Sequence, residues 1–229
     1  ESLSNVDDAE EARWQISRWK NDFISPEQAV SLAENDTELK HAMLYGRYQR
    51  QLKAYNAFDF DDLILQPVVL FQQHPQVLEK WQKRIHYLLV DEYQDTNAVQ
   101  YCILRGLSLD HQHLAVTGDP DQAIYGWRGA SIRNILEFER DYTDARVVTL
   151  EQNYRSTANI LGTADRVIAN NSRRKQKQLK TDAAAGEPIR IFLDSTSHDE
   201  AERIATEIAD AINTRTRQPN DFCILFRTN

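Results

Sequence analysis

Apolar residues recur at helical spacing up to about residue 84 of the chain. Ser25, followed by Pro26 and then by Gln28, combines a capping residue, a proline at the first helical position and a capping-box partner, so a helix is predicted to begin there. A polar break at 56–59 precedes another helix at 63–71, and His74-Pro75 introduces the next. An apolar stripe before that break consists of Leu44, Tyr48, Leu52 and Tyr55. This segment is predicted to be a helical subdomain in which nothing catalytic is required.

From residue 85 the pattern changes to short apolar runs that alternate with amphipathic stretches. Apolar runs of about five residues predict strands, and the stretches between them predict helices. Such alternation implies an α/β fold, with a parallel sheet whose faces are covered by helices. A second α/β unit is expected to begin after Leu150. The predicted strands are 85–90, 113–117, 146–150, 189–193 and 222–226, and the predicted helices are 96–107, 131–142, 156–170 and one capped by Ser197 and Glu200.

Composition and charge exclude little. Of the 229 residues, 41% are hydrophobic and 27% are charged, as in ordinary globular domains. No stretch approaches the roughly 20 apolar residues of a membrane span, so no membrane partner is expected. The net charge of −8 argues mildly against nucleic acid, while a basic run from Arg166 to Lys180 is more typical of a solvated face than of a binding patch. Cys102 and Cys223 lie in apolar runs without metal-type spacing, which predicts buried, reduced thiols.

Acidic side chains follow two successive predicted strands. Asp91 and Glu92 come directly after the first strand, and the segment 118–122, which includes two aspartates and Gln122, comes after the second. Ligands of open parallel sheets bind beyond the carboxyl ends of the strands. One carboxylate there can hold Mg²⁺, directly or through its water shell, while its neighbour orients an attacking water. The cluster indicates a nucleotide hydrolase, whereas an acidic pair alone is as typical of a helix cap.

Four longer motifs give this cluster a context. They are FDFDDL at 58–63, DEYQDTN at 91–97, GDPDQAIYGWRGA at 118–130 and QNYRS at 152–156. In order and approximate spacing they resemble the UvrD/Rep/PcrA branch of the superfamily-1 DNA helicases, and LFRTN at 225–229 resembles the start of that family's second motor domain. The resemblance implies a RecA-like parallel sheet of the P-loop NTPase fold. It implies part of a helical subdomain in 1–55, the C-terminal part of the first motor domain in 56–150, and the linker and start of the second in 151–229.

The resemblance also implies a role for each matching residue. Asp91 would hold Mg²⁺, and Glu92 would be the general base that activates water for ATP hydrolysis. Gln122 would contact the γ-phosphate, Tyr154 would stack on the adenine, and Arg155 would act as an arginine finger from the linker between the motor domains. The alternatives are a helix cap for the acidic pair, an ordinary loop amide for the glutamine and a surface salt bridge for the arginine.

A platform for single-stranded DNA is implied at Tyr125, Trp127 and Arg128. Aromatic faces stack on any base, and a neighbouring arginine adds charge, so the grip tolerates any sequence. Phe60 would be a further base-contacting aromatic residue. Two alternatives stay open at this point: the aromatic side chains of the turn could fill the core, and Phe60, which alternates with carboxylates, could simply pack inside.

A P-loop motif is absent from this sequence, because none of its seven glycines is followed by Lys. The chain does not begin with Met and stops at Asn229, just after an apolar run, so we expect an interior fragment that is inactive alone. The intact protein is expected to be a cytoplasmic, nucleoid-associated ATP-dependent helicase that moves 3′ to 5′ on single-stranded and forked DNA, with repair or replication proteins as partners. The alternatives are a non-enzymatic fragment that binds single-stranded DNA or a protein, and a subunit of a RecB/AddA-type helicase–nuclease.

Overall fold

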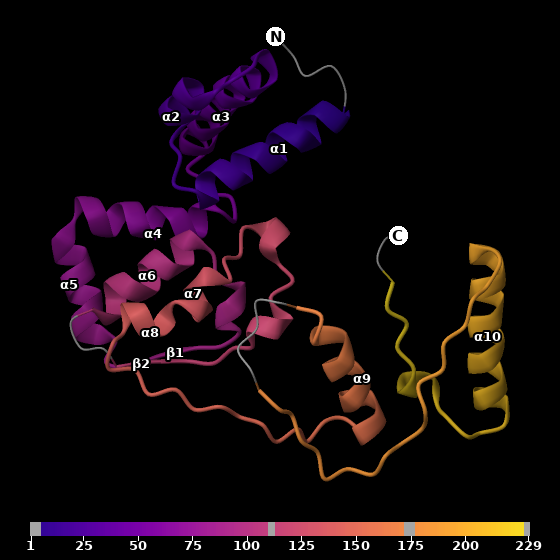
Figure 1. Ribbon diagram of the computed structural model, residues 1–229. Coiled ribbons are helices and arrows are strands. Elements are labelled where there is room, and N and C mark those ends of the chain that lie inside the picture. Colours follow the sequence, from indigo (N-terminus) through magenta and orange to yellow (C-terminus); the bar gives the residue numbers. More distant parts are fainter. Residues whose placement is uncertain (1–5, 110–112, 172–176, 227–229) are drawn as a thin grey trace. The chain divides into compact units, whose positions relative to one another are not determined.

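The computed structural model describes residues 6–109, 113–171 and 177–226, which divide into two compact units (Figure 1). Unit 1 contains Glu1–Thr149 and Asn171–Gln176, and unit 2 contains Leu150–Asn170 and Lys177–Asn229. The main chain therefore crosses from unit 1 to unit 2 between Thr149 and Leu150.

Three helices at the start of unit 1 share a small core of their own. α3 (Asp36–Ala54) packs against both α1 (Val6–Asn21) and α2 (Pro26–Leu32). The predicted capping box is confirmed, since Ser25 Oγ accepts from the Gln28 N–H at 3.2 Å and Gln28 Oε1 accepts from the Ser25 N–H at 2.8 Å. Trp19 of α1 stacks on Tyr45 of α3 with ring centroids 6.1 Å apart. The buried residues around this pair are Ile16, Ala29 and Ala42.

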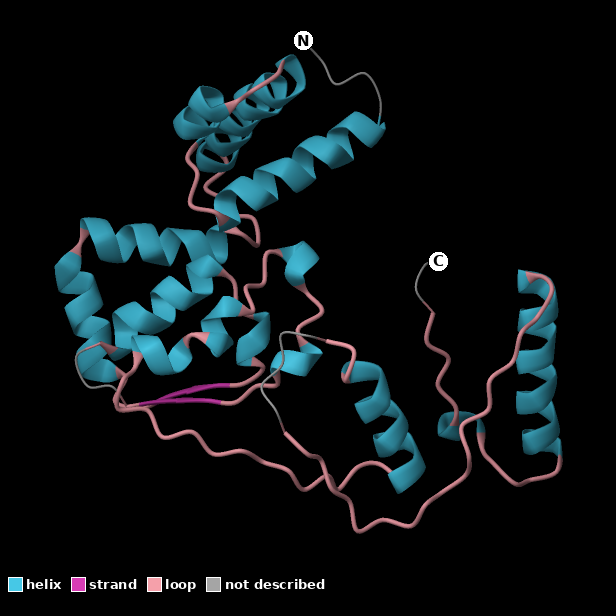
Figure 2. Ribbon diagram, viewed as in Figure 1, coloured by secondary structure: helices cyan, strands magenta, loops and turns pink. Residues whose placement is uncertain are grey.

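The rest of unit 1 contains a parallel pair of short strands, the magenta arrows of Figure 2. α4 (Asp62–Gln73) and α5 (Pro75–Arg84) lead to β1 (Leu88–Val90), and α6 (Ala98–Ser108) connects β1 to β2 (Leu114–Val116). Val90 lies opposite Val116, and α6 packs against α4 and α5. Parallel strands need such a crossover, so the predicted β–α–β order and the parallel pairing are confirmed.

Short helical turns carry the chain around the carboxyl ends of the strands. η1 (Tyr93–Asp95) follows β1, while η2 (Pro120–Gln122) and η3 (Gly126–Arg128) follow β2. The single helix predicted at 131–142 is instead two short ones, α7 (Arg133–Leu136) and α8 (Phe138–Asp141), separated at Glu137. α7 packs on η1, and buried Tyr93 meets Phe138 edge-on at 5.6 Å. The acidic segment after β1 therefore rests on α7 and α8.

The prediction of a larger sheet is wrong for the described residues. Segments 146–150, 189–193 and 222–226 are irregular, and β1 and β2 are shorter than predicted (Figure 2). An apolar run supplies the side chains of a strand, but the strand itself depends on backbone hydrogen bonds to a neighbour. Among the described residues only β1 and β2 provide each other with that neighbour. Leu193 and Leu225 accordingly remain 98% and 90% exposed.

Unit 2 holds two longer helices and a linker fastened by backbone hydrogen bonds. α9 (Ala158–Ile168) and α10 (Ser197–Asn213) are separated by an irregular segment, and η4 (Pro219–Asp221) follows α10. The Asn153 N–H donates to Lys180 O at 2.7 Å, and the Lys180 N–H donates to Glu151 O at 2.8 Å. Thr196 caps α10 by accepting from the Asp199 N–H at 3.1 Å, so the cap predicted at Ser197 is wrong by one residue.

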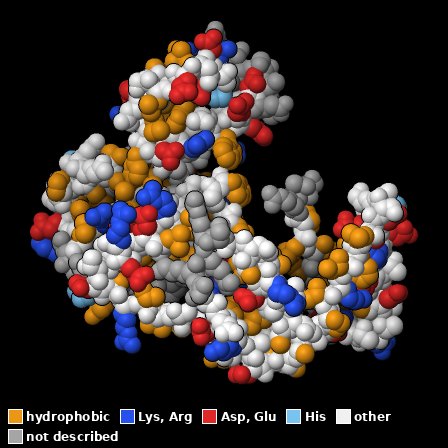
Figure 3. All heavy atoms as spheres, in the orientation of Figure 1, with side chains coloured by type: hydrophobic (Ala, Val, Ile, Leu, Met, Phe, Trp, Pro, Cys, Tyr) orange, Lys and Arg blue, Asp and Glu red, His pale blue; other side chains and the backbone are white. Residues whose placement is uncertain are grey.

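The face drawn in Figure 3 shows no single dominant charge. Figure 3 shows acidic and basic side chains interspersed on the visible face. Of the basic run, residues 172–176 lie outside the described ranges. No helix within those ranges has both the length and the apolar character needed to cross a membrane. Cys102 is half-buried and Cys223 is exposed, so the prediction of two buried thiols is wrong.

Candidate functional site

Asp91 and Glu92 leave the carboxyl end of β1 beside the end of β2. The Thr117 N–H donates to Val90 O at 2.8 Å and the Tyr93 N–H donates to Thr117 O at 2.9 Å, which fixes the backbone on both sides of the acidic pair. The Thr117 hydroxyl and the Glu92 N–H both donate to Asp91 Oδ1. Glu92 has φ 50° and ψ 44°, a left-handed conformation that is uncommon outside glycine and clusters at functional sites. Two exposed carboxylates are thereby held at the sheet edge where ligands bind.

Gln94, for which the sequence predicted no role, organises this cluster. Its side chain is almost fully buried, at 1% exposure. Gln94 Nε2 donates to Glu92 Oε2 at 2.7 Å, and Gln94 Oε1 accepts from the Asp119 N–H at 3.0 Å. One amide therefore bridges the loops after β1 and β2 and directs the Glu92 carboxylate. The signal in the sequence was a glutamine among five carboxylates, but its burial and its hydrogen bond with Asp119 depend on the paired strands.

The loop after β2 holds Gln122 through Asp119. Asp119 Oδ1 accepts from the Asp121 N–H at 2.9 Å, and its Oδ2 accepts from Gln122 Nε2 at 2.9 Å. Gly118 gives the loops room to approach, because a Cβ at that position would lie 2.6 Å from Gln94 Oε1. The structure thus brings the carboxylates and the amide predicted for unit 1 to one edge of the strand pair.

The oxygen ligands available at Asp91 suit a magnesium ion that is held partly through water. Hydrogen bonds from the Thr117 hydroxyl and then from the Glu92 backbone hold the pKa of Asp91 below its usual range, so the carboxylate is ionised at neutral pH. Both bonds end on Oδ1, which leaves Oδ2 for water or a cation. Within the described part of the chain, no group of three His, Cys, Asp or Glu side chains could enclose a metal. Mg²⁺ keeps several waters and commonly takes one or two carboxylates together with substrate phosphates, so this partial site fits it.

The aromatic turn (residues 125–129) presents two aromatic rings and an arginine. The Arg128 N–H donates to Tyr125 O at 2.8 Å, and Gly129 closes the turn with φ 83°, a conformation that favours glycine. The Arg128 guanidinium lies 4.5 Å from the Trp127 ring centroid and 5.3 Å from that of Tyr125, within cation–π range. Trp127 is 57% exposed and Tyr125 is 38% exposed, so the alternative in which they fill the core is wrong.

The aromatic turn is fastened to the segment that carries the acidic pair. The Ser131 N–H donates to Thr96 O at 2.9 Å, and Asn97 forms an isolated antiparallel bridge with Ala130. Asn134 of α7 donates to the same Thr96 carbonyl at 3.1 Å. These contacts directly follow both motifs, so they join the two segments within unit 1.

The Phe60 loop (residues 55–61) joins α3 to α4 and is anchored by a buried lysine. Lys20 of α1 is 0% exposed, and its Nζ lies 2.6 Å from Asp59 Oδ2 and 2.9 Å from Asp62 Oδ1. The Tyr48 hydroxyl donates to Asp59 Oδ2 at 2.9 Å, and burial together with this hydrogen bond raises the pKa of Tyr48 to about 12. Phe60 itself is 90% exposed, so the alternative in which it packs inside is wrong.

Tyr154 and Arg155 lie in unit 2, on the linker that precedes α9. Asn153 Oδ1 accepts from the Arg155 N–H at 3.0 Å and from the next backbone N–H at 2.8 Å, which closes a turn. Both predicted side chains are exposed, Tyr154 at 89%, and Arg155 forms no ion pair within the described residues. The linker is packed tightly on Gly186, where a Cβ would lie 2.5 Å from Thr157 Oγ1.

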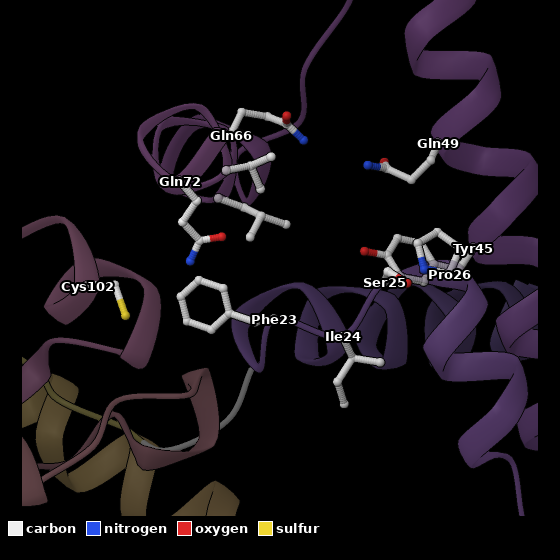
Figure 4. A pocket seen from close by; sticks show the side chains of 11 residues that line it. Phe23, Ile24, Ser25, Pro26, Tyr45, Gln49, Gln66, Gln72 and Cys102 are labelled. Carbon is white, nitrogen blue, oxygen red and sulfur yellow. The ribbon is translucent and has the colours of Figure 1, made fainter. Parts of the chain in front are cut away.

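A cavity of about 380 Å³ in unit 1 contains none of the residues predicted for the site (Figure 4). It lies where the α1–α2 connection meets α3, α4 and α6, with Phe23 and Tyr45 among its walls and glutamine side chains around it. The predicted nucleotide site is therefore an open sheet edge and not this cavity.

Comparison with known families identifies the class of protein that this fold and site define. Residues 2–143 match the model of the UvrD/REP helicase N-terminal domain, and residues 148–229 match that of the UvrD-like helicase C-terminal domain. The chain belongs to the UvrD/REP helicase family, and the resemblance found in the motifs is confirmed.

The named relatives of this chain are longer proteins. It is 46% identical over 214 residues to the ATP-dependent DNA helicase PcrA of Leuconostoc citreum, and 46% identical over 224 residues to the ATP-dependent DNA helicase UvrD1 of Mycobacterium tuberculosis. Each alignment covers 93% of this chain and 29% of the relative. The chain thus spans less than a third of the length of these relatives.

Proposed function

We propose that the protein containing this chain is an ATP-dependent helicase that translocates 3′ to 5′ on single-stranded DNA and opens forked DNA. One observation carries the proposal: the exposed pair Asp91 and Glu92 is fastened through Thr96 to an exposed turn of aromatic residues. A hydrolytic site and a base-stacking site are thus mechanically joined within unit 1. The printed names of the relatives, ATP-dependent DNA helicases, support the same activity and favour this branch over the helicase–nuclease alternative.

In this proposal the two units are parts of two RecA-like motor domains of the P-loop NTPase fold. Residues 1–55 are part of a helical subdomain, 56–150 the C-terminal part of the first motor domain, and 151–229 the linker and the start of the second. The parallel pair and its helical crossover in unit 1 support the assignment of the first motor domain.

The hydrolytic step assigns one task to each residue at the sheet edge. Asp91 would hold Mg²⁺ with Oδ2, the oxygen that accepts neither the Thr117 nor the Glu92 hydrogen bond, and the ion would supply positive charge for the phosphates of ATP. Glu92 takes the proton of the attacking water, and its hydrogen bond to Gln94 aims the carboxylate. Gln122, held by Asp119, reports the presence of the γ-phosphate through an amide that can donate or accept.

The linker residues make hydrolysis depend on closure of the two motor domains. Tyr154 stacks on the adenine, and Arg155 reaches the γ-phosphate to stabilise the charge that develops there. Their exposure on a turn held by Asn153 is consistent with such contacts.

The isolated chain is proposed to bind ATP weakly and to be inactive as a helicase, because it contains no Gly-Lys sequence of a P-loop to cradle the phosphates. The intact protein is proposed to work in the cytoplasm at the nucleoid, with DNA repair or replication proteins as partners.

The DNA platform can be tested on this chain by titration with a fluorescent oligo-dT. Trp127→Ala should weaken binding about 5- to 150-fold, since stacking contributes about 1–3 kcal/mol per base. Trp14→Ala is a matched control, because Trp14 is exposed to a similar extent, 54%, on α1 of the same unit. Equal affinities of the parent chain and Trp127→Ala would refute the platform.

The hydrolytic role can be tested in the intact protein with Glu92→Gln. The amide keeps the shape and can still accept from Gln94, so nucleotide binding should persist while ATP turnover falls about 10²- to 10⁴-fold. Unchanged turnover would remove Glu92 from the mechanism. An intact protein that binds DNA without any ATPase activity would favour the non-enzymatic alternative.

A further inference from the structure

Asn21, the last residue of α1, lies where three segments of unit 1 meet. Its Nδ2 donates to Asp61 Oδ1 at 3.0 Å, in the Phe60 loop. Its Oδ1 accepts from Asn97 Nδ2 at 2.5 Å, at the cap of α6 that follows the acidic segment. Gly129 of the aromatic turn is the third neighbour, since a Cβ there would lie 3.7 Å from Asn21 Cβ.

The chemistry of this position requires an amide in one orientation. Nδ2 uses both of its hydrogens, on Asp61 and on the Ser17 carbonyl at 2.8 Å, while Oδ1 receives the Asn97 donor. A flipped amide would turn its oxygen toward two acceptors and its NH₂ toward a donor. An aspartate could not donate at all. Asn21 therefore fixes the distance from the Phe60 loop to the cap of α6 through one rigid side chain.

The contact matters because Phe60 is exposed and each of its two neighbours in sequence is held by a side chain of α1, Asp59 by Lys20 and Asp61 by Asn21. Lys20 holds Asp59 and Asp62, two residues that bracket the exposed ring. Within the described residues, the hydrogen bond to the side chain of Asp61, the immediate neighbour of Phe60, comes from Asn21. Asn97 in turn is bridged to Ala130, which directly follows the aromatic turn. A chain of contacts thus runs from Phe60 through Asn21 to the turn that carries Trp127.

We infer that Asn21 is a positioning residue that sets the Phe60 loop against the aromatic turn, so that both grip the same single strand of DNA. The inference rests on the proposed DNA-binding function and adds to it a residue in the helical subdomain that need not touch DNA itself. Its substitution should uncouple Phe60 from binding while leaving the contribution of Trp127 in place.

The test measures the affinity of the chain for fluorescent oligo-dT in two backgrounds. In the parent chain, Phe60→Ala and Trp127→Ala should each weaken binding about 5- to 150-fold. In the Asn21→Ala background, Phe60→Ala should change the affinity less than about twofold, whereas Trp127→Ala should keep its full effect. Asp22→Ala is the matched control background, because Asp22 is the next residue after Asn21 and, within the described ranges, its ion pair is a 4.0 Å contact with the exposed Arg18 of α1.

A second background separates positioning from folding. Asn97→Asp removes the donor to Asn21 but keeps an oxygen that can cap α6, and Asp caps helices as well as Asn does. If Phe60→Ala no longer changes the affinity for oligo-dT in the Asn97→Asp background, and the thermal midpoint of that background is unchanged, the inference is supported. This holds even if Asn21→Ala unfolds the chain. The inference would be overturned if Phe60→Ala weakened oligo-dT binding as strongly in a folded Asn21→Ala or Asn97→Asp background as it does in the parent chain. If neither aromatic substitution weakens binding in the parent chain, the proposed platform itself fails, and the inference fails with it.

Discussion

Replacing Lys20 with methionine tests the buried ion pairs that hold the Phe60 loop. Methionine fills a similar volume without a charge, so the change removes the common cation of Asp59 and Asp62 and little else. The hydrogen bond from Tyr48 to Asp59 remains. The two carboxylates then face each other with no compensating charge.

The expected cost follows from the burial of the three side chains. Lys20 is 0% exposed, Asp62 is 3% exposed and Asp59 is 22% exposed. Removing one partner of a buried ion pair costs about 3–5 kcal/mol, because an uncompensated charge is left in the interior. Because Asp59 is partly exposed to water, the expected loss in the free energy of unfolding lies near the lower bound, at about 3 kcal/mol. For a unit of this size the midpoint temperature of unit 1 should then fall by about 6–12 °C.

The assay is thermal and urea unfolding followed by circular dichroism. Arg18→Met is the control, because Arg18 lies on the same helix, its side chain is 66% exposed, and its ion pair with Asp22 spans 4.0 Å. Exposed pairs contribute about 0–1 kcal/mol, so this control should unfold close to the parent chain. A Lys20→Met chain as stable as the Arg18→Met control would refute the argument that the buried charges are coupled.

Low pH should reduce the difference in the free energy of unfolding between the Lys20→Met variant and the parent chain. Burial raises the pKa of Asp59, but the hydrogen bonds from Lys20, the Asp62 backbone and Tyr48 outweigh it and hold the pKa below its usual range. A depressed pKa stabilises the fold above the unfolded-state value of about 3.9, and this stabilisation is lost as the pH falls through the folded-state value. Without Lys20, protonation instead relieves the repulsion. A difference in the free energy of unfolding that grows below about pH 4 would contradict this reasoning.

Three glycine substitutions test the close contacts of the site and of the linker in unit 2. Gly118→Ala should destabilise unit 1 by about 1–3 kcal/mol in urea unfolding and displace Gln94, whereas Gly126→Ala, with open space at its Cβ, should not. Equal stabilities of these two variants would rule out the packing argument. Gly186→Ala should loosen the linker of unit 2, because it combines φ 74° with a Cβ only 2.5 Å from Thr157 Oγ1. Faster amide hydrogen exchange at Asn159, whose N–H donates to Ala185 O, would register that loosening, and an unchanged rate would speak against it.

Local signals in the sequence predicted the helices and the chemical character of the site. The capping box at Ser25 and Gln28 acts across three residues, so it could be identified without any tertiary information. The order of the motifs was sufficient to identify the family, and the acidic pair was found at the end of a strand as expected. The apolar runs at 146–150, 189–193 and 222–226 misled the strand prediction, since pairing depends on a neighbour and not on the run itself.

Tertiary structure alone decided which polar groups hold the site in place. Lys20 meets Asp59 across 39 positions of sequence, and Asn97 meets Asn21 across 76. Gln94 became a buried bridge only because β1 and β2 pair in parallel and bring their following loops together. Capping and periodicity operate within one or two turns of the chain, whereas these contacts require loop closure and the burial of charge, which depend on how the whole unit packs. The sequence by itself therefore determined the family and most of the helices and pointed to the candidate reacting groups, and the packed fold determined how those groups are held.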